Sequence, residues 1–468
     1  MNSIDQIIST ALPVEGGILL ILFIAIFISS MFEKEERAAY LSLLLGIALS
    51  LPFLLPFLFN FSYPDWISLA LVALPLIALL VLFFPFRGRI QYSMQNPTDR
   101  FDERDTMFSR RTLVPGSERF NEYYERQPGN KPLDNKFRKL PGLLKAGTQY
   151  YDPILFAAAN SIFERVETDL HPRVEGTVAG AKAETAAPGE ISKMLLKMAV
   201  DWGAVSAGIT ELHDYHVYSI GGRGDRYGKE FKVDHKYALA FTVEMDYDMM
   251  RAAPGAPTVL ESANQYLQSG MIAVQLAEFI RAMGYPARAH IDGNYKVICP
   301  LIARDAGLGE IGRMGLLMTP KLGPRCRIAV VTTDLPLIPT PAKPQATTID
   351  FCRRCEKCAL VCPTQSIEYG PEKIHGGEIS ADIQANNPSG DQDSIKRWKI
   401  DDAGCFAYWC QAGTDCGRCM IVCPYAHPDN WFHRLIRFGI RNNILFRRLA
   451  VPMDDLFYGK KPSPRAIR

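Results

Sequence analysis

The sequence predicts a three-part chain, with a helical membrane anchor, an α/β core and a cysteine-rich segment after the core. Long apolar stretches are confined to the first 90 residues. Helix and strand patterns alternate through the middle of the chain, and all 11 cysteines lie between Cys299 and Cys423. Because the cysteines form one group, eight of them are expected to serve one functional region, whereas Cys299, Cys326 and Cys410 are expected to be small buried side chains.

Three segments without a charged residue predict three transmembrane helices, at residues 16–32, 38–62 and 66–86. A helix of about 17 to 25 residues crosses a hydrocarbon core of about 30 Å. Helices buried in a soluble domain normally keep a polar face, and these segments show none. We therefore expect residues 1–90 to form a multi-pass anchor in the lipid bilayer.

The basic residues around these segments indicate their orientation. Lys34 and Arg37 lie in the loop after the first segment, and Arg87 and Arg89 follow the third, whereas the turn at 63–65 has no basic residue. Loops rich in lysine and arginine face the cytoplasm. The large C-terminal part is thus expected on the cytoplasmic side of the inner membrane, where a reducing environment suits free thiols.

The region between the anchor and the cysteine runs is expected to contain two parts. Residues 91–190 are polar but rich in aromatic side chains, which indicates an arm that wraps the core. Residues 191–340 alternate helix and strand patterns, as an α/β core does. Within it we expect helices at 191–202 and 265–283, and strands at 237–245, 287–291 and 327–333.

The first cysteine run has the spacing of an iron-sulfur ligand motif. Cys352, Cys355, Cys358 and Cys362 are followed by Pro363, which gives C-x2-C-x2-C-x3-C-P. In two-cluster ferredoxins the fourth cysteine of such a run binds the neighbouring cluster. A zinc site is less consistent with this run, because zinc usually takes its four ligands as two separated pairs.

The second run, Cys416, Cys419 and Cys423, lacks one ligand, since Gly413 stands where a cysteine is expected. Either Cys405 or Cys410 can complete it, and we favour Cys405. One cluster then takes Cys352, Cys355, Cys358 and Cys423, and the other takes Cys362, Cys405, Cys416 and Cys419. Residues 341–430 are thus expected to form a ferredoxin-like domain with two 4Fe-4S clusters, and residues 431–468 an extension that packs on the core.

A glycine-rich segment at residues 306–315 precedes the last expected strand. Its glycines match the G-x-G-x-x-G spacing, but no strand comes before them, so a nicotinamide site is not indicated. Glycine lets backbone N–H groups approach a ligand closely. We expect this segment to contact a large flat ligand through Gly307, Gly309, Gly312, Arg313, Met314 and Gly315.

Three stretches together resemble the corrinoid-dependent reductive dehalogenase family: CFAYWCQAGTDCGRCMIVCP at 405–424, DAGLGEIGRMGLLMTPKLGPRCRIAVVTTDLPL at 305–337 and DDLFYGKKP at 454–462. The similarity extends over nearly all of the chain after about Phe101. It implies a nitroreductase-like core that binds cobalamin or another corrinoid without a histidine below the cobalt. It also implies a ferredoxin-like domain with two 4Fe-4S clusters, and it supports Cys405 over Cys410.

The resemblance further implies three catalytic residues. Tyr266 matches the family's catalytic tyrosine and Arg327 the basic residue beside it, while Asn294 matches a polar residue nearby, with Lys296 as a competitor. Tyrosine is a weak acid, so a permanent cation that stabilises its phenolate helps it deliver a proton. Because no lower cobalt ligand is implied, three histidines are expected to be structural: His213, His216 and His290.

The implied activity is reductive removal of halide from an organohalide such as a halogenated aromatic. Electrons are expected from a separate ferredoxin, a flavoprotein or a membrane quinol system. The formal charge of +2 gives no indication of nucleic acid binding. Two alternatives stay open: an epoxyqueuosine-reductase-like corrinoid enzyme, for which a basic face is expected, and a membrane electron-transfer protein without a substrate, for which so large a core is not needed.

Overall fold

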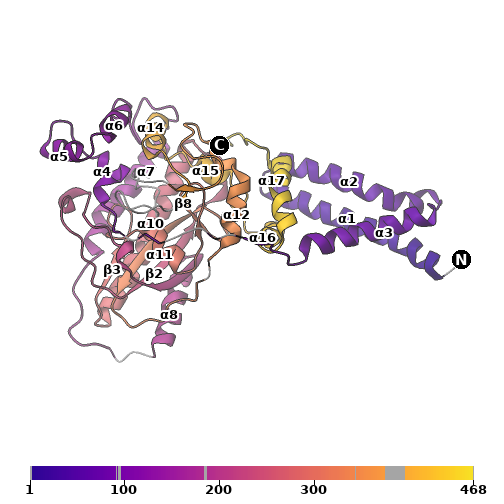
Figure 1. Cartoon of the computed structure of the whole chain (residues 1–468), viewed down its shortest axis with the longest axis horizontal. Coiled ribbons are helices and arrows are strands. Elements are labelled where there is room, and N and C mark those ends of the chain that lie inside the picture. The colour runs from indigo at the N-terminus through magenta and orange to yellow at the C-terminus, as the bar shows by residue number, and fades with distance from the viewer. Residues whose placement is uncertain are drawn as a thin grey trace. The chain divides into compact units, whose positions relative to one another are not determined.

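The chain divides into two compact units in the computed structural model (Figure 1). The structure describes residues 3–90, 92, 96–97, 99–183, 187–342, 344–374 and 396–466. We call the first unit, residues 1–90 with 428–462, the anchor unit. The second, residues 91–427 with 463–468, is the core unit.

The anchor unit contains the three expected membrane helices, α1 (Ser3–Phe32), α2 (Glu36–Phe59) and α3 (Asp65–Phe83). All three are long and apolar enough to cross a membrane. Glycines allow α1 and α2 to pack closely, since a Cβ atom added at Gly46 would lie 2.6 Å from Phe23 Cβ. Small residues at such contacts are a common device of membrane helix pairs.

The C-terminal helices α16 (Trp431–Asn442) and α17 (Ile444–Tyr458) belong to the anchor unit. The expectation that residues 431–468 pack on the core is therefore wrong for most of this segment; only residues 463–468 group with the core unit. Polar contacts with the membrane helices explain the difference. Asn443 Nδ2 donates to the Val81 and Phe84 carbonyls at 2.7 and 2.8 Å, which satisfies groups that the end of α3 leaves open.

The core unit is built on one four-stranded antiparallel sheet in the order β1-β2-β6-β3. Its strands are β1 (Ser206–Glu211), β2 (Tyr237–Glu244), β3 (Ala287–His290) and β6 (Cys326–Thr333). Three of them match expected strands to within about one residue at each end. The expected helix at 265–283 is longer and begins at Ala256, with Pro257 in its first turn.

Helices cover both faces of this sheet. On β2, Leu239 and Phe241 point to the cluster that contains α10 (Ala256–Ala282), and Ala238 and Ala240 to the cluster that contains α11 (Cys299–Asp305). This alternation follows from the two-residue period of a strand. The strand is apolar on both faces because both are buried.

The remaining α-helices belong to the arm, to the segments that flank the sheet strands and to the cysteine region. They are α4 (Met107–Arg110), α5 (Glu118–Arg126), α6 (Asn130–Phe137), α7 (Pro153–Arg165), α8 (Pro188–Asp201), α9 (Tyr247–Arg251), α12 (Ala346–Cys355), α13 (Lys357–Val361), α14 (Asp402–Ala412) and α15 (Arg418–Ile421). Four short strands form two antiparallel pairs, β4 (Glu310–Ile311) with β5 (Leu317–Met318), and β7 (Lys373–Ile374) with β8 (Lys396–Arg397).

A buried ion-pair network joins the arm to the cysteine region. Arg110 donates from Nε to Asp134 Oδ2 at 2.9 Å and from Nη1 to Asp402 Oδ2 at 3.2 Å. All three side chains are almost fully buried. Removing any one would leave an uncompensated buried charge, so this network fixes α14 against the arm.

Candidate active site

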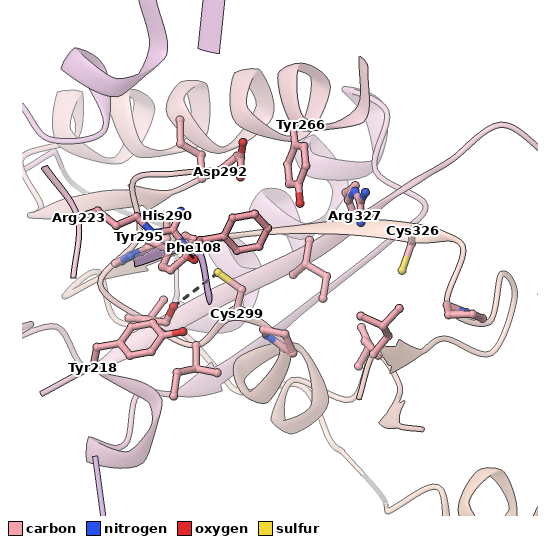
Figure 2. A pocket seen from close by; sticks show the side chains of 18 of the residues that line it. Phe108, Tyr218, Arg223, Tyr266, His290, Asp292, Tyr295, Cys299, Cys326 and Arg327 are labelled. Carbon is pink, nitrogen blue, oxygen red and sulfur yellow. Dashed lines mark hydrogen bonds between the residues drawn. The ribbon is translucent and has the colours of Figure 1, made fainter. Parts of the chain in front are cut away.

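The side chains of Tyr266 and Arg327 are in contact with each other. Tyr266 lies in α10, and Arg327 is the second residue of β6, opposite Val243 of β2. The guanidinium carbon of Arg327 is 4.7 Å from the centre of the Tyr266 ring. Figure 2 shows the Tyr266 hydroxyl pointing away from the helix into a cavity, with Arg327 beside it. The structure thus brings together the two residues that the sequence singled out from distant segments.

Two polar side chains hold Arg327 in place. Its Nη2 atom donates to Asp415 Oδ2 at 2.8 Å and to Ser262 Oγ at 2.6 Å, and Ser262 donates to the same carboxylate oxygen. Asp415 directly precedes Cys416. Among the residues that the structure describes, neither Arg327 Nε nor Asp415 Oδ1 has a hydrogen-bond partner, although both atoms are buried. A buried donor and a buried acceptor without partners suggest that a bound group satisfies them.

Burial keeps Tyr266 protonated. It raises the pKa of the phenol to about 12, although the Arg327 cation acts in the opposite direction. Burial also raises the pKa of Asp415, again against the effect of Arg327. Tyr266 therefore holds a proton that it can donate across the neutral pH range.

The first cavity has a volume of about 190 Å³ and lies beneath Tyr266 (Figure 2). Its walls are mainly apolar and aromatic, which suits an organic ligand. Arg223 lies at the side away from Cys326, between the rings of Tyr295 and Phe108 at 4.9 and 5.2 Å. The aromatic side chains that line the cavity are Phe108, Tyr218, Tyr266 and Tyr295.

A second cavity of about 180 Å³ adjoins the first. The two share five lining residues: Phe108, Tyr266, Leu316, Arg327 and Met420. Four cysteines also line the second cavity, and they are the four that the sequence assigns to one cluster: Cys362, Cys405, Cys416 and Cys419. Tyr266 and Arg327 thus stand between an aromatic cavity and a set of thiols.

The thiols of the other predicted cluster, Cys352, Cys355, Cys358 and Cys423, lie close enough to affect one another's pKa. Burial raises the pKa of the Cys423 thiol well above its usual value, and Cys355, Cys352 and Cys358 raise it further. No three His, Cys, Asp or Glu side chains in the described parts of the chain are arranged to hold a single ion.

Cys405 and Cys410 have different surroundings although both lie in α14. Cys405 lines the second cavity, and its pKa is raised by burial and by Cys419, Cys416 and Cys362. Cys410 is buried in an apolar cluster with side chains such as Phe406, and burial raises its pKa to about 11. This arrangement favours Cys405 as the ligand.

The side chain of Asn294 lies away from Tyr266 and Arg327 and is engaged by other residues. Its side chain accepts from Arg288 Nη2 at 2.9 Å and donates to the His171 carbonyl at 3.4 Å, and it lines neither cavity. Its competitor Lys296 pairs with Glu175 at 3.0 Å. In this structure the turn that contains Asn294 directs its amide into a hydrogen-bond network with Arg288 and His171, and a catalytic role for Asn294 stays a prediction.

Sequence reasoning missed three polar residues near Tyr266. Asp292, two residues before Asn294, lines the first cavity, and burial raises the pKa of its carboxyl. Ser262 lies four residues before Tyr266, which places both on one side of a helix. Asp415 stands next to a predicted cluster ligand. These spacings are the signals that could have identified Ser262 and Asp415.

The glycine-rich segment serves mainly for packing. Of its six predicted ligand contacts, only Met314 lines a cavity, the second one. A Cβ atom at Gly312 would lie 2.6 Å from Met318 Cγ, and one at Gly309 would clash with the Met318 carbonyl. Gly307 and Gly315 adopt positive φ angles of 82° and 74°, which glycine tolerates best. Gly312 and Gly315 thus serve the tight turn between β4 and β5, and backbone contacts of this segment with a ligand stay a prediction.

Arg313 is buried and acts as a clamp on the first cysteine run. Its Nε and Nη2 atoms donate to the Cys352 carbonyl at 3.1 and 2.9 Å, and Nη1 donates to the Glu368 carbonyl at 2.7 Å. The guanidinium also stacks on Trp398 at 4.7 Å. Arg313 therefore holds the backbone that carries Cys352 and lines neither cavity.

The histidines near the site are engaged in structural contacts. His290 lies in the wall of the first cavity, but Nδ1 faces Arg288 Nη1 at 3.0 Å and Nε2 faces Thr332 Oγ1 at 2.9 Å. Burial lowers its pKa well below the usual value, so the ring stays neutral. His216 contacts Asp305 Oδ2 at 2.9 Å, and His213 stacks on Tyr215.

Comparisons with known proteins agree with this arrangement. Residues 351–427 match the 4Fe-4S dicluster domain family. A tetrachloroethene reductive dehalogenase of Sulfurospirillum multivorans is 34% identical over 220 residues, which are 47% of this chain and 41% of the relative. The chain thus spans about two fifths of that relative's length.

Two solved structures share the fold. A catabolic reductive dehalogenase, NpRdhA, in complex with 3-bromo-4-hydroxybenzoic acid has a TM-score of 0.60 and 23% identity, over 80% of this chain and 49% of that one. A reductive dehalogenase whose structure suggests a mechanism for B12-dependent dehalogenation has a TM-score of 0.59 and 22% identity, over 80% and 49%. These matches confirm the predicted fold class: three apolar N-terminal helices, a reductive-dehalogenase-like core and a dicluster domain with two 4Fe-4S clusters.

Proposed function

We propose that this chain is a membrane-anchored reductive dehalogenase that replaces a halogen on carbon by hydrogen. The balanced reaction is R–X + 2e⁻ + H⁺ → R–H + X⁻. It requires an organic cavity, a proton donor, a route for electrons and a group that reacts with the carbon–halogen bond. The sequence similarity to reductive dehalogenases and the fold support this activity.

One observation carries the proposal. Tyr266 and Arg327 stand where an aromatic cavity adjoins a cavity lined by four cysteines of the dicluster domain. This arrangement supplies a proton on one side and electrons on the other. A membrane electron-transfer protein without a substrate would need the cysteines, but it would not need the buried tyrosine, the arginine and the aromatic cavity.

The residues around the two cavities fit a corrinoid. Arg327 Nε and Asp415 Oδ1 are a buried donor and a buried acceptor without partners in the described structure, and peripheral amides of a corrinoid both donate and accept. Met314, Leu316 and Met420 offer apolar contacts. His290 also lies in the wall of the first cavity, but both of its ring nitrogens are engaged by Arg288 and Thr332. When bound, the corrinoid supplies a low-valent cobalt for cleavage of the carbon–halogen bond.

The chain's own residues have the following roles in this proposal. Tyr266 donates the proton that the carbon requires, and the Arg327 cation stabilises the phenolate that remains. Asp415 and Ser262 hold the guanidinium against the ring. The proposed proton transfer does not use Asn294, whose amide is bound to Arg288.

A halogenated aromatic is the proposed substrate class. The rings of Phe108, Tyr218 and Tyr295 line the first cavity, where they can stack against a planar substrate. The complex of a fold relative with 3-bromo-4-hydroxybenzoic acid is consistent with this class. Electrons would come from a ferredoxin, a flavoprotein or a membrane quinol system, with the core unit on the cytoplasmic side.

The test is a combined corrinoid and activity measurement. The purified full chain, reconstituted with its clusters, should yield extractable corrinoid and should release halide from brominated or chlorinated phenols with a low-potential reductant. Absence of corrinoid after reconstitution would overturn the proposal. Bound corrinoid without halide release from any organohalide would also reject it, and would favour an epoxyqueuosine-reductase-like activity.

A further inference from the structure

The C-terminal helices cover one end of the membrane helix bundle. Arg37 Nε donates to the Leu456 carbonyl at 3.0 Å, and Arg87 Nη2 donates to Asn442 Oδ1 at 3.0 Å. Figure 1 shows α17 running across the end of α1 and α2. Helix α1 ends, α2 begins and α3 ends at this side of the bundle. Helices α16 and α17 therefore lie at the level of one membrane surface, if the three helices span a bilayer.

Buried polar contacts fix α16 at this level. His433 Nε2 lies 3.2 Å from Glu33 Oε2, and both side chains are less than a tenth exposed. Asn430 donates to Ser29 Oγ at 3.1 Å and also to Glu33. A buried, hydrogen-bonded pair of this kind resists separation, because removal of one partner leaves the other unpaired. The helices are thus part of the anchor and not a mobile tail.

A stripe of apolar side chains remains exposed on these two helices. Their spacing of three or four residues places them on one face of each helix. Their exposed fractions lie between 37% and 49%. We call this surface the apolar stripe, and it consists of Trp431, Leu435 and Phe438 on α16 and of Leu445, Leu449, Met453 and Leu456 on α17.

The same helices carry an excess of positive charge. Residues 431–461 contain seven lysines and arginines but two aspartates. Arg434 and Arg448 are exposed within the stretch that carries the apolar stripe, and Lys460 and Lys461 follow α17. Arg434 Nε also lies 3.3 Å from Asp429 Oδ1 in an exposed ion pair, which is worth little in water. Arg437, Arg447 and Asp454 are buried and do not contribute to this surface charge. Apolar residues flanked by exposed lysine and arginine are typical of helices that lie in a membrane surface.

We propose that α16 and α17 form an interfacial membrane helix pair, whose apolar stripe enters the bilayer surface and whose basic residues bind the phosphates of anionic lipids. The continuity of the pair with α1–α3 selects lipid as the partner, because lipid surrounds the bundle at this level. The pair sits where anionic lipids are abundant if this surface is the cytoplasmic one. It would set the height and tilt of the bundle end from which the core unit begins.

Trp431 allows a direct test in the full-length protein. The chain is placed in lipid nanodiscs of phosphatidylethanolamine and phosphatidylglycerol, and Trp431 emission is obtained as the difference between the native chain and Trp431→Phe. Because interfacial helices reach a depth of about 5–10 Å, lipids brominated on their acyl chains should quench this emission, whereas unbrominated lipids of the same headgroups should not. Acrylamide, a water-soluble quencher, should quench it less in nanodiscs than in detergent.

Two results would overturn the proposal. Full access of acrylamide to Trp431 in nanodiscs would mean that the stripe faces water. Shielding from acrylamide in both nanodiscs and detergent, without quenching by brominated lipid, would mean that the core unit or a second copy covers it. Because the readout is fluorescence, it is independent of dehalogenase activity, and failure of the proposed function would leave it unchanged.

The role of charge is tested with paired variants. Arg434→Gln with Arg448→Gln should increase acrylamide quenching of Trp431 in anionic nanodiscs, and nanodiscs of neutral phosphatidylcholine should have the same effect on the native chain. Arg119→Gln with Arg165→Gln, which removes two exposed charges from the core unit, is the matched control. Equal quenching in the two double variants would reject the binding of anionic lipid.

Discussion

Two arginines, the buried Arg313 and the partly buried Arg327, both stack on an aromatic ring but have different surroundings. Each stacks on an aromatic ring at 4.7 Å, Arg313 on Trp398 and Arg327 on Tyr266. Arg313 donates to the backbone carbonyls of Cys352, Glu368 and Arg353 and lines neither cavity. Arg327 is held by side chains, lines both cavities and has a buried Nε without a partner in the described structure. Hydrogen-bonding capacity left over at a cavity wall, rather than burial or stacking, separates a candidate catalytic arginine from a structural one.

The largest effect is expected for two cysteines of α14, Cys405 and Cys410, of which one faces a cavity and the other packs among apolar side chains. Cys405→Ser should remove about half of the bound iron, because one of two clusters loses a ligand, and activity should fall to background. Cys410→Ser should retain both clusters, since its thiol packs among apolar side chains. Iron content, electron paramagnetic resonance and halide release measure this. The reverse pattern would overturn the ligand assignment.

The rings on which the two arginines stack are also expected to differ in role: Tyr266 as a proton donor and Trp398 as a packing residue. Tyr266→Phe keeps the ring but removes the proton donor, so kcat should fall by about 10²- to 10⁴-fold with corrinoid content unchanged. Trp398→Phe should lower stability but leave kcat within about threefold, because it affects packing. Steady-state kinetics in a low-potential reductant distinguishes these outcomes. A Tyr266→Phe enzyme with native kcat would exclude the tyrosine as donor.

Replacing each arginine by glutamine tests the comparison directly. Arg327→Gln should lower kcat by about 10²-fold, the usual effect of losing a charged stabilising group, with little change in unfolding. Arg313→Gln should lower the free energy of unfolding by about 2–4 kcal/mol, since buried carbonyls lose their donors. Urea unfolding followed by loss of cluster absorbance measures the second effect. An equal loss of kcat in both variants would contradict the assignment of a catalytic role to Arg327 and a structural role to Arg313.

Asp415→Asn should have a smaller effect. The amide keeps its volume but loses the charge that holds Arg327, so kcat should fall by about 3- to 10-fold, as for other positioning groups. Because the Arg327 cation remains, the variant should stay above Arg327→Gln. Glu356→Gln is the matched control, since Glu356 lies 3.6 Å from Arg313 at the surface of the cysteine region. Similar losses in both variants would contradict a positioning role for Asp415.

The smallest effect is expected for the pH dependence: kcat should not decrease at alkaline pH. Burial raises the pKa of Tyr266 to about 12, and the protonated form is the active one. The group therefore stays active below its pKa, and kcat should not fall with rising pH up to about pH 10 on account of this residue. A pH–rate profile of the reconstituted enzyme measures this. A decline near pH 8 that disappears in Tyr266→Phe would contradict the assigned pKa.

Much of the organisation could be predicted because the signals are local. The membrane helices follow from uncharged runs of sufficient length, and the sheet strands from apolar runs between turns. The cysteine spacing indicated two clusters, and Cys405 lines a cavity with three other predicted ligands of its cluster. Tyr266 and Arg327 came from the family resemblance, because spacing alone does not pair a helix residue with a strand residue 61 positions away.

The sequence by itself determined the three apolar N-terminal helices, the strands and the cysteine motif, because chain periodicity and ligand spacing are set within a few residues. Only the tertiary structure decided which polar side chains face the cavities. It joined Asp415 and Ser262 to Arg327, turned Asn294 toward Arg288 and used Arg313 as a backbone clamp. It also placed α16 and α17 with the anchor, through contacts between residues about 400 positions apart. Such contacts depend on long-range packing, which no local pattern specifies.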